Sequence, residues 1–245
     1  MIIDVHCHLD LLEGIDSIIK TCLDKNIIIV TQGINAETNR KALEFSNKYT
    51  NVKAALGIYP EDALKLSEKE INDELKFIES NKNKIIAIGE IGLDGTYSDM
   101  EKQKKVFEKL VKLSIKLDIP VIVHSRKAEI LCIEELEKLK AKKVIMHCFS
   151  GNLKLVKRIE ENGWYLSIPA NVNYSEHFQK IVSIVDINNL LCETDSPFLS
   201  PEKKFPNTSL NVMYSYKKIA EIKKISLNEV NKIIENNFNK LFILP

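Results

Sequence analysis

The few histidines of this chain follow short apolar runs. Of the five histidines in 245 residues, only His177 stands elsewhere, and the others are His6, His8, His124 and His147. A single residue separates His6 from His8, so in an extended segment both imidazoles point to the same side. Neutral imidazole is a common ligand of divalent metal ions. We therefore expect these four histidines to bind metal, and we place His177, on a polar helical segment, at the solvated surface.

Two carboxylates stand in equivalent places after other apolar runs. Glu90 lies in Gly-Glu-Ile-Gly-Leu-Asp at positions 89–94, and Asp195 lies in Glu-Thr-Asp-Ser-Pro at positions 193–197. Each candidate alone has an ordinary explanation: a hydrogen-bonded histidine at a strand end, a glutamate paired with a lysine, or an aspartate that caps a helix. Together, four imidazoles and two carboxylates suit a divalent cation such as Zn²⁺, Mn²⁺ or Mg²⁺.

Six potential ligands leave room for two metal ions per subunit. In a two-metal site the ions lie roughly 3.5–4 Å apart, and Glu90 would bridge them as part of the catalytic machinery. The chemistry of such a site is the activation of water for attack on an ester or a similar bond. The sequence therefore predicts a metal-dependent hydrolase.

Arg126 and Ser150 are the candidates for binding a substrate anion. Arg126 follows His124 by two residues and is one of only three arginines in the chain. Its planar guanidinium can hold a phosphate, although an ion pair with a glutamate is an equal alternative. Ser150 precedes a helix expected to begin near Leu153, where amide donors and a hydroxyl can bind an anion.

Eight short apolar runs alternate with segments of helical periodicity along the chain. Continuous apolar runs are typical of strands buried on both faces, and their alternation with helices favours a parallel sheet. Eight units predict one (β/α)₈ TIM-barrel domain over residues 1–245, with a doubly wound open sheet as the rival. In a barrel, the candidate residues fall at the strand ends where active sites lie. The expected strands are Ile2–Val5, Ile27–Thr31, Val52–Leu56, Ile85–Ile88, Pro120–Val123, Val144–Met146, Trp164–Ile168 and Leu190–Cys192.

Several helix starts carry a capping-box pattern, in which a serine caps amides of the first helical turn. A further helix over residues 227–241 follows the eighth unit, and we expect this extra C-terminal helix to pack on the barrel exterior. The capping pairs are Ser67 with Glu70, Ser98 with Glu101, and Ser226 with Glu229.

The charges of the chain are balanced, with 35 basic and 34 acidic residues. No broad electrostatic field therefore draws it to a polyanion or a membrane, and a nucleic acid would have to be bound locally. No apolar run approaches the ~20 residues that span a bilayer, and the first residues lack the pattern of a secretory signal. We expect a soluble, cytoplasmic protein without an obligate protein partner.

Five motifs, in their order and approximate spacing, make the chain resemble the TatD family of metal-dependent hydrolases within the amidohydrolase superfamily. They are Asp-x-His-x-His at 4–8, Gly-Glu-Ile-Gly-Leu-Asp at 89–94, Pro-Val-Ile-Val-His-Ser-Arg at 120–126, His-Cys-Phe-Ser-Gly at 147–151 and Glu-Thr-Asp-Ser-Pro at 193–197. The resemblance implies DNase activity, often as a 3′ to 5′ exonuclease on single strands. It also implies that Asp195 accepts the proton of the attacking water, and that the metal ligands are His6, His8, Glu90, His124, His147 and Asp195.

The chain departs from the family pattern in two places. A Gly-x-His-Pro turn is usual after the third strand, but this chain has Tyr59 at the histidine position. Tyr59 can donate a hydrogen bond to a substrate and stack on a base, but it lacks the charge of an imidazole. Between Pro197 and Asn211, Lys203 and Lys204 stand where the family usually has arginine. Both departures concern the choice of substrate more than the metal chemistry.

Three functions are consistent with these residues. The leading hypothesis is a phosphodiester hydrolase that acts on single-stranded DNA or DNA ends, since balanced charge disfavours broad binding of duplex DNA. The second is the hydrolysis of an ester or amide, such as an aminoacyl-tRNA ester, because the same chemistry attacks a carbonyl carbon. The third is a barrel that binds a partner or a nucleic acid without turnover.

Overall fold

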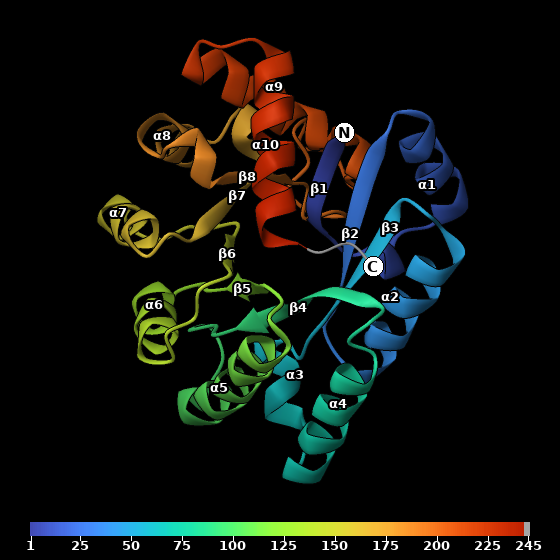
Figure 1. Cartoon of the computed structure of the whole chain (residues 1–245), viewed down its shortest axis with the longest axis vertical. Coiled ribbons are helices and arrows are strands. Elements are labelled where there is room, and N and C mark those ends of the chain that lie inside the picture. Colours follow the sequence, from blue (N-terminus) through green and yellow to red (C-terminus); the bar gives the residue numbers. More distant parts are fainter. Residues whose placement is uncertain (243–245) are drawn as a thin grey trace.

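Eight parallel strands form the centre of the molecule, which the computed structural model describes over residues 1–242 (Figure 1). The strands are hydrogen-bonded in the order β1 to β8, the same order as in the sequence. A doubly wound sheet would change direction within this order, so the TIM barrel predicted from the sequence is confirmed. The strands are β1 (Ile2–Cys7), β2 (Ile27–Gly33), β3 (Val52–Leu56), β4 (Ile85–Gly92), β5 (Val121–His124), β6 (Val144–His147), β7 (Tyr165–Pro169) and β8 (Leu190–Glu193).

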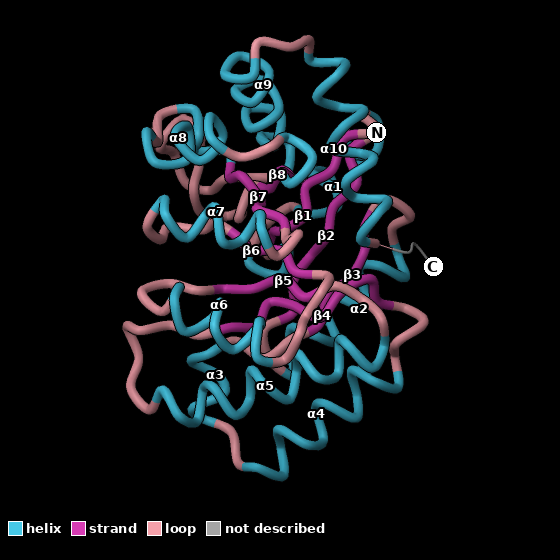
Figure 2. The backbone as a smooth tube through the Cα atoms, turned by 60° about the vertical axis from the view of Figure 1, so that its left-hand side comes forward, coloured by secondary structure: helices cyan, strands magenta, loops and turns pink. Residues whose placement is uncertain are grey.

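Helices surround this sheet on its outer side, as Figures 1 and 2 show from two directions. None of the helices described combines the length and the apolarity that crossing a membrane requires. The α-helices are α1 (Ile15–Asp24), α2 (Ala36–Lys48), α3 (Pro60–Lys65), α4 (Glu68–Ser80), α5 (Met100–Leu117), α6 (Glu129–Lys138), α7 (Leu153–Glu161), α8 (Glu176–Ile184), α9 (Val212–Lys223) and α10 (Leu227–Leu241).

Several strands are longer than the apolar runs that predicted them. β4 continues to Gly92 because Gly92 pairs with His124 of β5, and β6 continues to His147, which pairs with Ser167 of β7. The polar residues at these positions keep the parallel ladder because pairing uses backbone groups, whatever the side chain. Glu90, His124 and His147 therefore lie within strands rather than beyond them.

Two of the three predicted capping boxes are confirmed, and one is wrong. Ser67 caps α4 and Ser226 caps α10, each with the expected glutamate returning a hydrogen bond. At α5, however, the N-cap is Asp99, whose carboxylate accepts from the backbone N–H of Lys102. Asp99 stands one residue after Ser98 and takes over the capping role because its side chain is an equally good cap.

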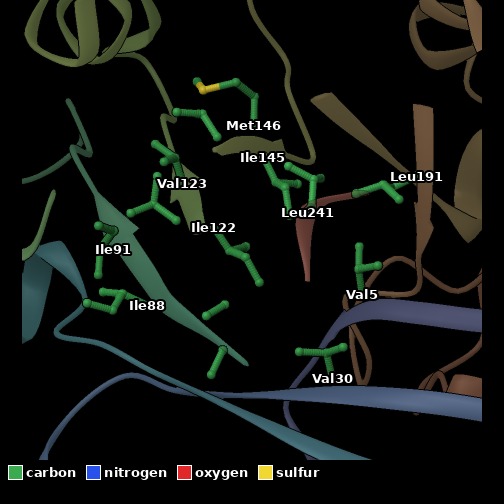
Figure 3. Packing of buried hydrophobic residues seen from close by; sticks show 14 of the residues in the cluster. Val5, Val30, Ile88, Ile91, Ile122, Val123, Ile145, Met146, Leu191 and Leu241 are labelled. Carbon is green, nitrogen blue, oxygen red and sulfur yellow. The ribbon is translucent and has the colours of Figure 1, made fainter. Parts of the chain in front are cut away.

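The helix α10 covers the seam between the first and last strands. It contacts β8 and β1, which confirms the predicted helix on the barrel exterior. Its buried face contains Val230, Ile234, Phe238 and Leu241, at the spacing expected for one side of a helix. Leu241 joins the same hydrophobic cluster as apolar residues of β1, β2, β4, β5, β6 and β8 (Figure 3).

Tyr216 of α9 satisfies backbone groups on the outer edge of β1. Its hydroxyl accepts from the N–H of Ile3 at 2.9 Å and donates to the carbonyl of the same residue at 3.3 Å. Both residues are fully buried. A side chain therefore supplies, at the seam between β8 and β1, hydrogen bonds that a neighbouring strand supplies elsewhere.

We predict that Tyr216→Phe destabilises the fold by about 1–3 kcal/mol, because it leaves the buried amide of Ile3 unpaired. Chemical denaturation would measure the free energy of unfolding. The control is Tyr165→Phe, since Tyr165 is only half-buried in β7 and its loss leaves no buried amide without a partner. Equal stability of the two variants would contradict the assigned role of Tyr216.

Candidate metal centre

The barrel closes at the end where the predicted site residues lie. The backbone N–H of Asp195 donates to the carbonyl of His6 at 3.0 Å, and that of His8 donates to Ser196 at 2.8 Å. These bonds join β1 to the segment that follows β8. All six predicted ligands come from the carboxyl ends of β1, β4, β5, β6 and β8, or from the residues just beyond them. Five of them, with His6 buried beneath, line a cavity of about 520 Å³.

Glu90 stands between two pairs of imidazoles. Its Oε2 lies 3.5 Å from His6 Nε2 and 3.4 Å from His8 Nε2. Its Oε1 lies 3.0 Å from His124 Nδ1 and 3.3 Å from His147 Nε2. Each carboxylate oxygen therefore faces a different pair, and this is the arrangement that a bridging ligand of two cations requires.

Asp195 extends the first of these groups. Its Oδ1 lies 3.5 Å from His6 Nε2 and 3.7 Å from His8 Nε2. Two overlapping sets of donor atoms are close enough to hold an ion, one with His6, Glu90 and His147 and one with His6, His8 and Asp195. His124 is in neither set, although its Nδ1 is the nitrogen nearest to Glu90.

The donor atoms fit a divalent metal in two respects. Both ring nitrogens of His6 are buried and without a hydrogen-bond partner, which is unfavourable for an imidazole unless another ligand binds it. The spacing of the atoms also fits, because tetrahedral ligands ~2.0–2.2 Å from a zinc ion lie roughly 3.3–3.6 Å from one another. Four of the six nitrogen–oxygen pairs that Glu90 and Asp195 form with the histidines fall within this range, and those of His124 with Glu90 and of His8 with Asp195 lie just outside it.

The electrostatics of the cluster also favour a cation. Burial raises the pKa of Asp195 to about 8, and repulsion from Glu193 and Glu90 adds to this effect. Burial opposes the charge of His147 as well, but Glu193 and Glu90 outweigh it and hold the pKa of this histidine well above its usual value. Asp195 and His147 thus bind protons in a place where a bound cation would replace them.

Two buried carboxylates that were given no role from the sequence support the histidines from behind. Asp94 Oδ2 lies 2.9 Å from His124 Nε2, the nitrogen that faces away from Glu90. Both oxygens of Glu193 lie 3.3 Å from His147 Nδ1, and Ser167 donates a hydrogen bond to Glu193. Metal-binding histidines commonly have such a carboxylate on the second ring nitrogen. A signal was present in the sequence, because both acids stand in the motifs that contain Glu90 and Asp195.

Asp4 is a third acid without an assigned role in the sequence. It is fully buried, and its two oxygens accept from the backbone N–H of Thr194 at 2.8 Å and from the Thr194 hydroxyl at 2.7 Å. The residue two before His6 is thereby joined to the residue just before Asp195. Asp4 therefore fixes β1 relative to the segment that contains Asp195.

Gly92 allows β4 and β5 to approach each other beside the site. Its φ is 154°, and a Cβ at this position would lie 1.8 Å from the carbonyl oxygen of His124. This glycine is the last residue of β4. Its lack of a side chain permits the close backbone contact that brings His124 to Glu90.

The predicted substrate-binding residues line the same cavity. The Tyr59 hydroxyl donates to Asp94 Oδ2 at 3.3 Å and lies 3.2 Å from His124 Nε2. Tyr59 therefore contacts both His124 and the carboxylate that is hydrogen-bonded to this histidine. Arg126 is exposed and forms no ion pair within residues 1–242. Within these residues, the alternative that Arg126 pairs with a glutamate is therefore excluded. The Ser150 hydroxyl donates to Glu129 Oε1 at 3.3 Å. Ser150 stands before the N-cap of α7, which is Asn152.

Two other sequence interpretations need correction. The alternative of Asp195 as a helix cap is wrong, because no helix begins at the residues after Asp195 and its side chain faces His6 and His8. His177 is not simply solvated, since it is half-buried and its Nε2 lies 3.2 Å from the carbonyl of Phe149. Neither environment could be deduced without the path of the loops after β6 and β8.

Comparison with protein families gives a match over nearly the whole chain. The protein-family model described as "TatD related DNase" matches residues 3–243. A protein of Methanocaldococcus jannaschii named an uncharacterized metal-dependent hydrolase is 35% identical, over 98% of this chain and 96% of the other. A Homo sapiens protein named deoxyribonuclease TATDN3 is 32% identical, over 98% of this chain and 94% of the other.

Comparison with solved structures gives the same fold. A TatD homolog of Escherichia coli superposes with a TM-score of 0.91 at 24% identity, covering 100% of this chain and 98% of the other. The family match covers the five motifs and the barrel that positions them. The chain therefore belongs to the TatD family of metal-dependent hydrolases.

Proposed function

We propose that this protein is a deoxyribonuclease that hydrolyses phosphodiester bonds in single-stranded DNA or at DNA ends. The observation that carries the proposal is the position of Glu90, whose two oxygens each face a separate pair of imidazoles. Enzymes that cleave phosphodiesters commonly use two metal ions held in this way. The names of the family and of the TATDN3 relative support a DNA substrate.

The residues divide between two proposed metal positions. His6, His8 and Asp195 would hold one divalent cation with Glu90 Oε2, and His124 and His147 would hold the other with Glu90 Oε1. Such cations polarise a phosphoryl oxygen and lower the pKa of water when they are bound.

Asp195 would accept the proton of the attacking water. Its side chain is 17% exposed, whereas that of His6 is fully buried, so Asp195 is the more accessible from the cavity. A carboxylate can accept a proton only in its ionised form. A cation held by His6 and His8 would stabilise this form and oppose the effect of burial on the pKa of Asp195.

Arg126 would bind a phosphate of the DNA strand. Arg126 lines the cavity, and within residues 1–242 no carboxylate pairs with its guanidinium. A guanidinium binds two phosphate oxygens at once, which can place the neighbouring phosphodiester at the cluster. Ser150 lines the same cavity and would add a hydroxyl donor if its bond to Glu129 is exchanged.

We predict that the purified protein releases nucleotides from a single-stranded DNA labelled at one end, and that EDTA abolishes this activity. Readdition of Zn²⁺, Mn²⁺ or Mg²⁺ in separate samples should restore it to different extents. The panel should include a phosphomonoester and an aminoacyl ester. Undiminished cleavage in EDTA would contradict the metal mechanism, and a preference for the aminoacyl ester would replace the DNase assignment with an esterase.

We predict that Asp195→Asn lowers kcat on DNA by about 10²–10⁴-fold, the usual contribution of general acid–base catalysis. The charge-matched control is Asp73→Asn, on the exposed surface of α4, which should leave kcat unchanged. Circular dichroism and thermal unfolding would verify that both variants fold. An Asp195→Asn variant with full activity would remove this residue from the proposed role.

We predict that Glu193→Gln weakens metal binding by about 10–100-fold, because an amide no longer stabilises the charge on His147. Competition with a chromogenic chelator would measure the affinity. The control is Glu129→Gln, the same change at a residue that contacts Ser150 rather than a histidine. Equal affinities for the two variants would show that Glu193 does not act on the metal centre.

A further inference from the structure

Two phenylalanines are exposed on the segment that follows β8. Phe205 is 75% exposed and Phe198 is 48% exposed, and their ring centroids lie 6.5 Å apart with the planes tilted by 45°. Neighbouring apolar rings that remain in contact with water commonly mark a binding surface. Phe198 and Phe205 together form an aromatic pair.

The backbone around the aromatic pair is held by internal hydrogen bonds. The side chain of Asn207 is buried and donates to the carbonyl of Thr194 at 3.0 Å and to that of Phe198 at 2.8 Å. Its backbone N–H donates to Pro197 at 2.8 Å. These bonds connect the two sides of the segment, and therefore they fix the place from which each ring projects.

The aromatic pair is continuous with the candidate metal centre. The backbone N–H of Phe198 donates to the carbonyl of Asp195 at 2.8 Å. Phe198 lines the cavity that is also lined by Glu90, Asp195 and Arg126. Phe205 contacts Phe198 and is more exposed, so it lies at the outer edge of this surface. If the bond to be hydrolysed lies at Asp195, the groups of the substrate next to that bond would reach the aromatic pair.

Basic groups accompany the rings. Lys203 precedes Phe205 by two residues, and its Nζ lies 4.6 Å from the ring centroid of Tyr174, which is itself 42% exposed. Arg126 lines the same cavity as Phe198. Cations beside exposed aromatic rings suit a ligand that carries both negative charges and flat rings.

We propose that Phe198 and Phe205 form a stacking surface for the unpaired bases of a single-stranded nucleic acid, next to the bond that is cleaved. This inference rests on the proposed function and specifies the part of the substrate that is recognised. Every base has a flat face, so stacking on the rings tolerates any sequence but requires the bases to be unpaired. A duplex end would therefore have to open before it could occupy the surface.

The first test is binding without catalysis. Fluorescence anisotropy in EDTA would measure the affinity for a fluorescein-labelled thymidine oligonucleotide and for the same strand in a duplex. We expect wild-type protein to prefer the single strand, and Phe205→Ala to weaken its binding by about tenfold. Phe205→Tyr keeps an aromatic ring and should retain wild-type affinity.

A matched control separates stacking from a general loss of apolar surface. Leu23 is 50% exposed near the end of α1, where the chain leads to the start of β2, and Leu23→Ala should bind as the wild type does. A strand whose terminal nucleotides lack bases removes the stacking partner from the DNA instead of from the protein. It should bind wild-type protein about tenfold more weakly, and Phe205→Ala should cause no further loss with this strand.

The outcomes distinguish this inference from the proposed function. If the wild type cleaves DNA with metal but Phe205→Ala binds both strands as the wild type does, the stacking surface is wrong and the DNase assignment stands. If base-dependent binding is found without cleavage under any metal, the stacking surface stands and the DNase assignment is wrong. Wild-type protein that neither binds nor cleaves the strand overturns both, and leaves the rings to a protein partner.

Discussion

The carboxylate of Glu90 is the group on which the rest of the site depends. It is buried, and the histidines around it outweigh burial and hold its pKa well below the usual value. A buried carboxylate is stable only with compensating partners, and here these come from three different strands. The barrel must therefore keep β1, β5 and β6 in register with β4. This requirement restricts the residue at position 92 to glycine, because only a residue without a side chain permits the backbone contact with His124.

The segment after β8 combines closure of the barrel with the chemistry of the site. Asp4 and the backbone of His6 and His8 hold residues 194–196 by hydrogen bonds, so β1 and Asp195 form one unit. On the outer side of the same strand, Tyr216 satisfies Ile3. The seam thus has a polar inner connection at the mouth and an apolar cover from α10. Because the aromatic pair follows directly, its position is coupled to the same closure.

Residue order and spacing were enough to predict the barrel, because each apolar run is buried on both faces and each helix has one buried side. The six clustered residues were predicted for a related reason, since parallel strands bring their carboxyl ends together. The roles of Asp94, Glu193 and Asp4 could not be derived in this way. Each role depends on which side chain of a neighbouring strand lies within hydrogen-bond distance. The alternation of strands and helices along the sequence does not give these distances. The cap of α5 was missed because Ser98 and Asp99 are both good caps and only local geometry selects one.

Tyr59 explains how a departure from the family pattern can leave the metal chemistry intact. Its hydroxyl is within hydrogen-bond distance of both Asp94 and His124, so it belongs to the network that orients this histidine. A phenol at this place is neutral, because burial and the nearby carboxylates raise its pKa far above the usual range. It therefore adds no positive charge for a phosphate. In the function proposed above, an anionic substrate would then be recognised by bound cations, by Arg126 and by Lys203, while the aromatic pair would contact the uncharged bases.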